Sequence, residues 1–160
     1  MTADFGNPNM AEVSQRHREQ IDHAVAMDKG LLMFAHSQGN LFVNRAYDHA
    51  LTRVGAESVR VVHVAPASPR LTGPHTLADQ DIVINLLRLV GSVPRITDMI
   101  PGPGQRILRP DLSERWDLLG HGLLETYLNR NFDPSSRIRQ HVEQALEALR
   151  SPQWSERPPY

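Results

Sequence analysis

The chain has 160 residues, of which 40% are hydrophobic and 22% charged, with a formal net charge of −1 and no cysteine. This composition is typical of a single globular domain, residues 1–160, and excludes a disordered chain. The basic residues are scattered, which argues against nucleic-acid binding, and the lack of cysteine excludes disulfides and thiolate chemistry. No apolar run reaches the roughly 20 residues of a membrane span, and no secretory signal is present. We therefore expect a cytoplasmic protein.

The first half of the chain alternates between helical and strand patterns. Apolar residues at helical spacing predict a surface helix over Met10–Asp28, and the all-apolar run Leu31–Ala35 predicts a strand buried on both faces. Gln38–Val54 again has helical spacing, and the β-branched segment Ser58–Ala65 predicts a second strand. This order of elements predicts an α/β fold in which a parallel sheet is flanked by helices.

The second half of the chain is less regular. Ile82–Val90 is apolar and fits either a helix or a strand, and the segments around it are rich in Pro and Gly, which predicts loops. Leu112–Asn129 mixes turn and helix patterns, whereas Ser135–Arg150 predicts a helix with one apolar stripe. Residues 151–160 form a polar, proline-rich tail.

A serine lies between the first predicted strand and the helix that follows, in the stretch LLMFAHSQGNLF. A sharp strand-to-helix turn exposes a serine hydroxyl for nucleophilic attack, and Ser37 stands at such a turn. Ala35 and Gly39 are small residues two positions away on either side, although the usual motif has glycine at both positions. The plain alternative is that Ser37 caps the following helix. The strand before it and the helix after it favour the nucleophile.

The segment FAHSQGNLFVN resembles the nucleophile elbow of lipase-like and esterase-like members of the α/β-hydrolase superfamily. The resemblance continues through VRVVHVAPAS, GPHTLADQDIVI and GHGLLETYL, and it covers roughly residues 30–128. It implies a serine hydrolase that cleaves carboxylic esters, of small molecules or lipids, through a Ser-His-Asp triad. It also implies that no cofactor is needed.

The family order of serine, acid and histidine implies a role for several residues of this chain. Ser37 matches the nucleophile, and His121, which lies between two glycines, matches the general base. The backbone N–H of Gln38 would belong to the oxyanion hole. His36, beside the serine, is interpreted as a supporting residue, and no pair of histidines has the spacing of a metal site.

The identity of the acid is open between three aspartates. Asp81 is preferred because the family's acid commonly precedes a short apolar run such as Ile82-Val83. Asp79 and Asp117 also precede His121 in the chain and remain alternatives. Asp81 could also simply cap a helix that starts at Ile82, and His121 could be a loop histidine without a role.

The resemblance is incomplete at the amino-terminal end. The family's nucleophile follows the fifth of eight strands, whereas one predicted helix and one predicted strand precede Ser37. The chain therefore resembles the C-terminal portion of the fold, without the loop that supplies the second oxyanion N–H. The first predicted strand would then have a bare apolar edge. The alternative function is a non-catalytic scaffold or interaction module that forms homo-oligomers through this edge.

Overall fold

The computed structural model describes residues 8–108 and 117–149, so the predicted tail at 151–160 lies outside the described residues. Its sheet has three parallel strands in the order β1-β2-β3. These strands are β1 (Leu31–His36), β2 (Val59–Val64) and β3 (His75–Thr76). The prediction of an α/β chain with parallel strands and helices is therefore confirmed.

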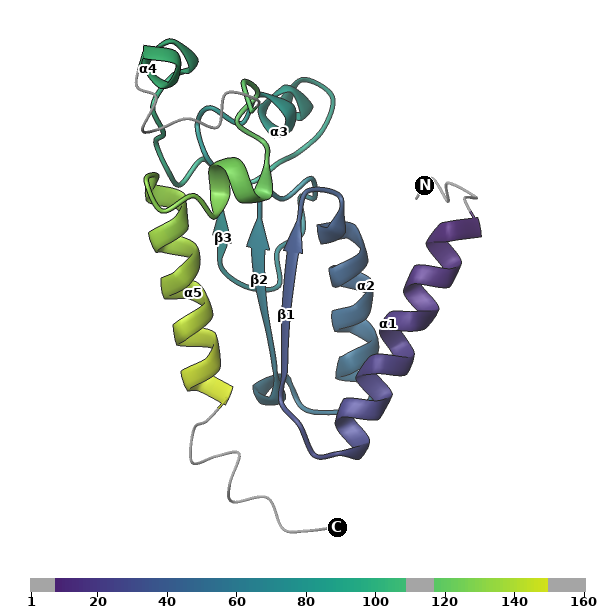
Figure 1. Cartoon of the computed structure of the whole chain (residues 1–160). Helices are drawn as coiled ribbons and strands as arrows, with labels where there is room; N and C mark the ends of the chain where they lie inside the picture. Colours follow the sequence, from purple (N-terminus) through teal and green to yellow (C-terminus); the bar gives the residue numbers. More distant parts are fainter. Residues whose placement is uncertain (1–7, 109–116, 150–160) are drawn as a thin grey trace.

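Helices cover both faces of the sheet. Helices α1 (Pro8–Ala26) and α2 (Gly39–Leu51) lie on one face, and α5 (Asp133–Leu149) lies on the other (Figure 1). Most of the short elements lie at the carboxyl ends of the strands (Figure 1). They are α3 (Ile82–Leu86), η2 (Leu87–Leu89), α4 (Pro103–Leu108) and the π-helix η4 (Leu123–Tyr127), whereas η1 (Ala56–Ser58) lies at the amino-terminal end of β2.

The middle strand, β2, carries the core. Its β-branched side chains pack on both faces, as the valine-rich sequence of a central parallel strand predicts. Val61 packs with Val43 of α2, whereas Val64 packs with Ile138 of α5. All four of these side chains are at least 93% buried, so β2 joins the two helical layers.

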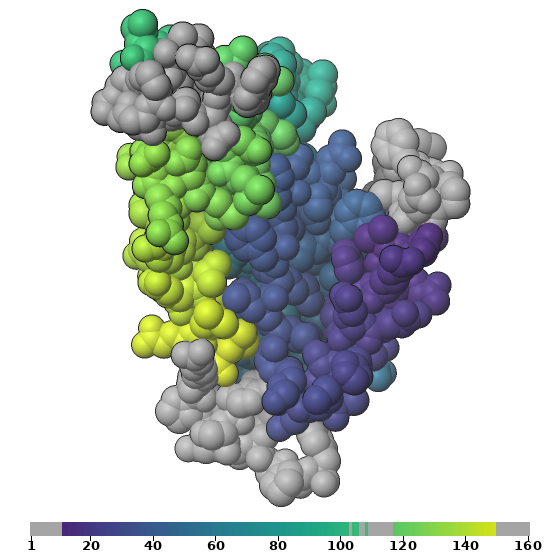
Figure 2. Space-filling model, viewed as in Figure 1, coloured from purple at the N-terminus to yellow at the C-terminus, as the bar shows by residue number. Residues whose placement is uncertain are grey.

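The first strand differs from its prediction in burial. Only Ala35 of β1 is buried, and Phe34 is 42% exposed, so the expectation of a strand buried on both faces is wrong. The physical reason is that β1 is an edge strand: within the described residues, only β2 pairs with it. The blue segment that contains β1 and α2 lies open between the purple α1 and the yellow α5 (Figure 2).

Other predicted elements shift at their ends or change type. The predicted helix Gln38–Val54 is the shorter α2, and the ambiguous run Ile82–Val90 is helical, as α3 followed by η2. Strand β3 lies in a stretch predicted to be a loop, because its two residues are too few to show a strand pattern. No helix in the described parts of the chain combines the length and apolarity needed to cross a bilayer.

We expect Ile138→Ala to lower the free energy of unfolding by about 2–4 kcal/mol, because it leaves a cavity between α5 and the sheet. Ile138 is 3% exposed, whereas Leu146 on the same helix is 37% exposed. Leu146→Ala is therefore the matched control and should cost less than about 1 kcal/mol. Urea denaturation measures both variants, and equal losses would contradict this account of the core.

Candidate active site

Ser37 lies on a sharp turn between β1 and α2. Its φ angle is 54°, in the left-handed region that strains a residue other than glycine by about 1–3 kcal/mol. Gln38, not Ser37, holds the N-cap position of α2, and it makes no side-chain capping bond there. The capping role considered for Ser37 is therefore wrong, and its hydroxyl is free to face another partner.

The two small residues beside the turn face each other. A Cβ atom added to Gly39 would lie 3.9 Å from the Cβ atom of Ala35, which is an ordinary van der Waals distance. The methyl group of Ala35 therefore fills the space between the strand and the first turn of α2. This contact explains how alanine is accommodated where the usual motif has its first glycine.

Three predicted side chains meet at the carboxyl end of the sheet. His121 Nε2 lies 3.0 Å from Ser37 Oγ, and His121 Nδ1 lies 3.0 Å from Asp81 Oδ2 and 3.2 Å from Asp81 Oδ1. The Asp81 side chain is fully buried, whereas the His121 side chain is 22% exposed. The hydroxyl, imidazole and carboxylate thus form one continuous hydrogen-bonded line from the surface inward.

The other partners of Asp81 determine which imidazole nitrogen carries the proton. Asp81 accepts hydrogen bonds from the Ile84 N–H at 2.9 Å and from the Tyr127 hydroxyl at 2.7 Å. The Tyr127 oxygen itself accepts from the Ala78 N–H, so its own hydrogen is directed at the carboxylate. Since Asp81 acts as an acceptor, His121 Nδ1 is the donor, and the neutral ring presents a lone pair at Nε2 to Ser37.

The remaining acid candidates are engaged elsewhere. Asp79 Oδ1 accepts from the Ile100 N–H at 2.8 Å and so holds the segment that follows η2. Asp117 accepts from the backbone N–H groups of His121 at 3.0 Å and Gly122 at 2.7 Å. Asp81, by contrast, both caps α3 and hydrogen-bonds to the His121 imidazole, so capping the helix does not prevent the contact expected of the acid.

The loop that carries His121 is tied to both sides of the site. Gly120 has a φ angle of 67°, and a Cβ atom there would lie 2.3 Å from the Gln80 carbonyl oxygen, so glycine is required. His36 Nε2 donates to the His121 carbonyl oxygen at 2.9 Å, and the two imidazole rings lie 4.9 Å apart. His36 therefore supports the loop directly from the end of β1.

Charge and burial shift the pKa values of His121 and His36 in opposite directions. The hydrogen bond to Asp81 raises the pKa of His121 above its usual value, because the carboxylate stabilises the protonated ring. Burial, with the neighbouring His121, lowers the pKa of His36. Burial also raises the pKa of Tyr127, so its hydroxyl remains protonated and continues to donate to Asp81.

One backbone donor beside the serine is available to an anion. At this turn the N–H groups of Ser37, Asn40 and Leu41 donate to backbone carbonyls, whereas no such bond is formed by Gln38 N–H within the described residues. Gln38 also precedes the first turn of α2, where the helix dipole favours negative charge. Among residues 8–108 and 117–149, the predicted oxyanion donor thus makes no backbone hydrogen bond.

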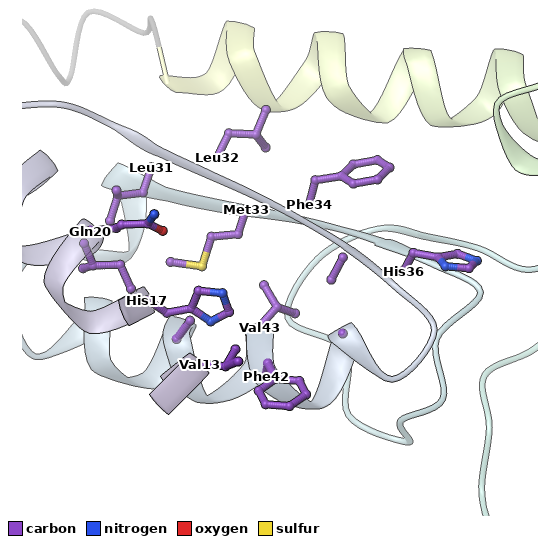
Figure 3. A pocket seen from close by; sticks show the side chains of 14 residues that line it. Val13, His17, Gln20, Leu31, Leu32, Met33, Phe34, His36, Phe42 and Val43 are labelled. Carbon is purple, nitrogen blue, oxygen red and sulfur yellow. The ribbon is translucent and has the colours of Figure 1, made fainter. Parts of the chain in front are cut away.

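A groove runs from this turn along the free edge of β1. It has a volume of about 490 Å³ and lies between β1, α1 and α2. Met33 points to the side that holds His17 and Val43, whereas Phe34 points to the opposite side of the strand (Figure 3). Most of the lining side chains are apolar, so the groove extends an apolar surface away from Ser37.

Sequence reasoning missed three residues that support the site. Tyr127 gives no local signal, because its contact with Asp81 depends on how distant segments pack. Asn40 does give a local signal, because asparagine is a poor helix former and yet lies on the buried side of α2. His63, which lies within the second predicted strand, is fully buried and bonded to Asn40.

Within residues 8–108 and 117–149, no three His, Asp or Glu side chains form a group that could hold a metal ion. Comparison of the chain with family models, curated proteins and solved structures found no match.

We expect NMR titration to show that His121 protonates with a pKa above 6.5 and His36 with one below 6.5. Protonated His121 then stabilises the fold below pH 6.5, and this contribution is lost as the pH rises through its folded-state pKa. Asp81→Asn should lower the pKa of His121, because the ring loses its charged partner. An unchanged His121 titration in that variant would contradict the bonding described.

Proposed function

We propose that this chain is a serine hydrolase of the α/β-hydrolase type that cleaves carboxylic esters. The observation that carries the proposal is the hydrogen-bonded line from Ser37 through His121 to the buried Asp81. The left-handed turn at Ser37 supports it, as does the resemblance of FAHSQGNLFVN to the elbow of lipases and esterases.

The proposed reaction starts with proton transfer within this line. His121 Nε2 removes the hydroxyl proton while Ser37 Oγ forms a bond to the ester carbonyl carbon. The carbonyl oxygen becomes an oxyanion, which accepts a hydrogen bond from Gln38 N–H. Asp81 holds the Nδ1–H tautomer and stabilises the imidazolium that has formed.

The intermediate then collapses to an acyl-enzyme. The bond to the leaving alcohol breaks, and His121 gives its proton from Nε2 to the alcohol oxygen. Water next attacks the acyl group, with His121 as base, and the proton returns to Ser37 Oγ when the acid leaves. The cycle needs no cofactor, since His121 passes the Ser37 proton to the alcohol and then passes a proton from water back to Ser37.

Apolar side chains exposed on the elements at the carboxyl end of the sheet favour an apolar ester, such as a lipid ester, over a highly polar one. At the carboxyl end of the sheet, Leu89 is 81% exposed and Val90 84% exposed, and Met99 and Leu124 are also exposed. Side chains of this type can contact an acyl chain when it leaves water, with a gain of about 0.8 kcal/mol for each buried methylene group.

Ser37→Ala should abolish labelling by a fluorophosphonate probe and lower p-nitrophenyl ester hydrolysis by at least about 10³-fold, because it removes the hydroxyl that His121 Nε2 contacts. Asp81→Asn should lower kcat/KM by about 10⁴-fold, because Nδ1 then loses its anionic partner. Mass spectrometry of the labelled protein and steady-state kinetics measure these effects.

Asp79→Asn is the control for the acid. Its remaining side-chain oxygen can still accept from the Ile100 N–H, so hydrolysis should stay close to the wild-type rate. If Asp79→Asn abolishes turnover and Asp81→Asn does not, the assignment of the acid is wrong. If the probe leaves folded wild-type protein unlabelled at Ser37, the proposed hydrolase activity is refuted.

The free edge of β1 favours a second candidate function, as a non-catalytic module that binds a second copy of the chain. The strand LLMFAH has no acidic residue, lysine, arginine or proline to block pairing, and Phe34 is exposed on it. Pairing of two identical edge strands is self-complementary, so a two-fold dimer satisfies both edges at once.

The second candidate predicts a dimer in sedimentation experiments at micromolar concentration and no hydrolysis of short p-nitrophenyl esters. Phe34→Lys should shift that dimer toward monomer, because a charge would stand in the paired edge. Leu89→Lys, at a more exposed apolar position outside β1, is the control and should leave the association unchanged. A monomer that hydrolyses such esters would exclude this candidate.

A further inference from the structure

The strained turn at Ser37 needs hydrogen bonds to hold it. The Ser37 N–H donates to the Val64 carbonyl at 3.1 Å, which ties the turn to the end of β2. The Ser37 carbonyl oxygen accepts from the Asn40 side-chain amide at 2.7 Å and from the Asn40 N–H at 3.1 Å. Asn40 therefore supplies the shortest bond to the backbone of the nucleophile.

The amide of Asn40 also connects the two strands. Its Nδ2 donates to the Ser37 carbonyl and, at 3.1 Å, to the Val64 carbonyl, so both of its hydrogens are used. Asn40 is fully buried, and its Oδ1 faces a donor, the Nδ1 of His63, at 2.7 Å. A buried amide with all these positions occupied has one orientation.

His63 fixes the orientation of the Asn40 amide through its hydrogen bond to Oδ1. Its Nε2 accepts from the Thr72 N–H at 3.0 Å, so in the neutral ring the proton is on Nδ1, which donates to Asn40. Gly73 permits this approach, since a Cβ atom there would lie 2.0 Å from the Val61 carbonyl oxygen. Burial lowers the pKa of His63 to about 4, with His75 nearby as a like charge, so the ring is neutral near pH 7.

We propose that Asn40, oriented by His63, is a positioning residue that holds Ser37 in its left-handed conformation and so aims Oγ at His121 Nε2. This inference rests on the proposed function of Ser37 as a nucleophile. Asn40 does not touch the reacting atoms. It acts through the carbonyl of the residue that does.

The same helix offers a matched control. Asn44 follows Asn40 by one helical turn, is 6% exposed, and donates at 3.1 Å to both Ser68 Oγ and the Arg70 carbonyl. It thus anchors the β2–β3 connection without a bond to Ser37. Asn40→Ala and Asn44→Ala each remove a buried asparagine amide from α2, but only the first releases the turn.

The rate of acylation separates positioning from a merely structural role. With each rate corrected for the folded fraction, we expect Asn40→Ala to lower the fluorophosphonate labelling rate and kcat by about 10- to 100-fold, with KM little changed, because Oγ leaves its attack geometry. Asn44→Ala should keep the wild-type values. Equal losses in both variants, or wild-type labelling in folded Asn40→Ala, would overturn the proposal.

A second pair of variants tests the inference if Asn40→Ala does not fold. In His63→Asn the new amide nitrogen can take the place of Nδ1 and donate to Asn40, so most of the rate should remain. His63→Leu removes the donor and should slow labelling by about tenfold. Equal rates in these two variants would show that His63 does not act through Asn40.

A crystallographic readout keeps the inference separate from the proposed function. The φ angle of Ser37 should leave the left-handed region in Asn40→Ala and stay there in Asn44→Ala. If the wild type is not labelled at all, the hydrolase proposal fails and these two angles still decide the positioning role. An unchanged φ angle in Asn40→Ala would refute it whatever the activity.

Discussion

The buried carboxylate of Asp81 is the point at which two segments that are far apart in the chain meet, residues 81–84 and residues 121–127. It accepts from the Ile84 N–H in α3, the Tyr127 hydroxyl in η4 and the His121 ring on the loop before η4. A carboxylate taken out of water costs several kcal/mol unless such donors compensate it. Convergence of the two segments is therefore a condition of burying this charge, and it also orients the imidazole.

A second constraint acts at Ser37, which contacts the other nitrogen of the His121 ring and directly follows the edge strand β1. An edge strand has support from one side only, yet the turn after β1 is strained. The Val64 carbonyl of β2 receives both the Ser37 N–H and the Asn40 amide. The geometry of the turn thus depends on β2 and the start of α2.

Local patterns made part of the site predictable. The strand-turn-helix around Ser37 was found because an apolar run, small flanking residues and a helical period are all adjacent in sequence. The choice of acid could not be made the same way. Asp79 and Asp81 are two residues apart and chemically identical, and only their different partners, Ile100 in one case and His121 in the other, distinguish them.

The sequence by itself determined the α/β class, the parallel strands and the turn at Ser37, because these follow from residue periods and propensities within short windows. Only the tertiary structure decided which of the three aspartates faces His121, and that Asn40 and His63 bond to each other beside the turn. Each of these depends on hydrogen bonds or packing between segments far apart in the chain. No local pattern records such distances, since they exist only once the sheet and its loops have come together.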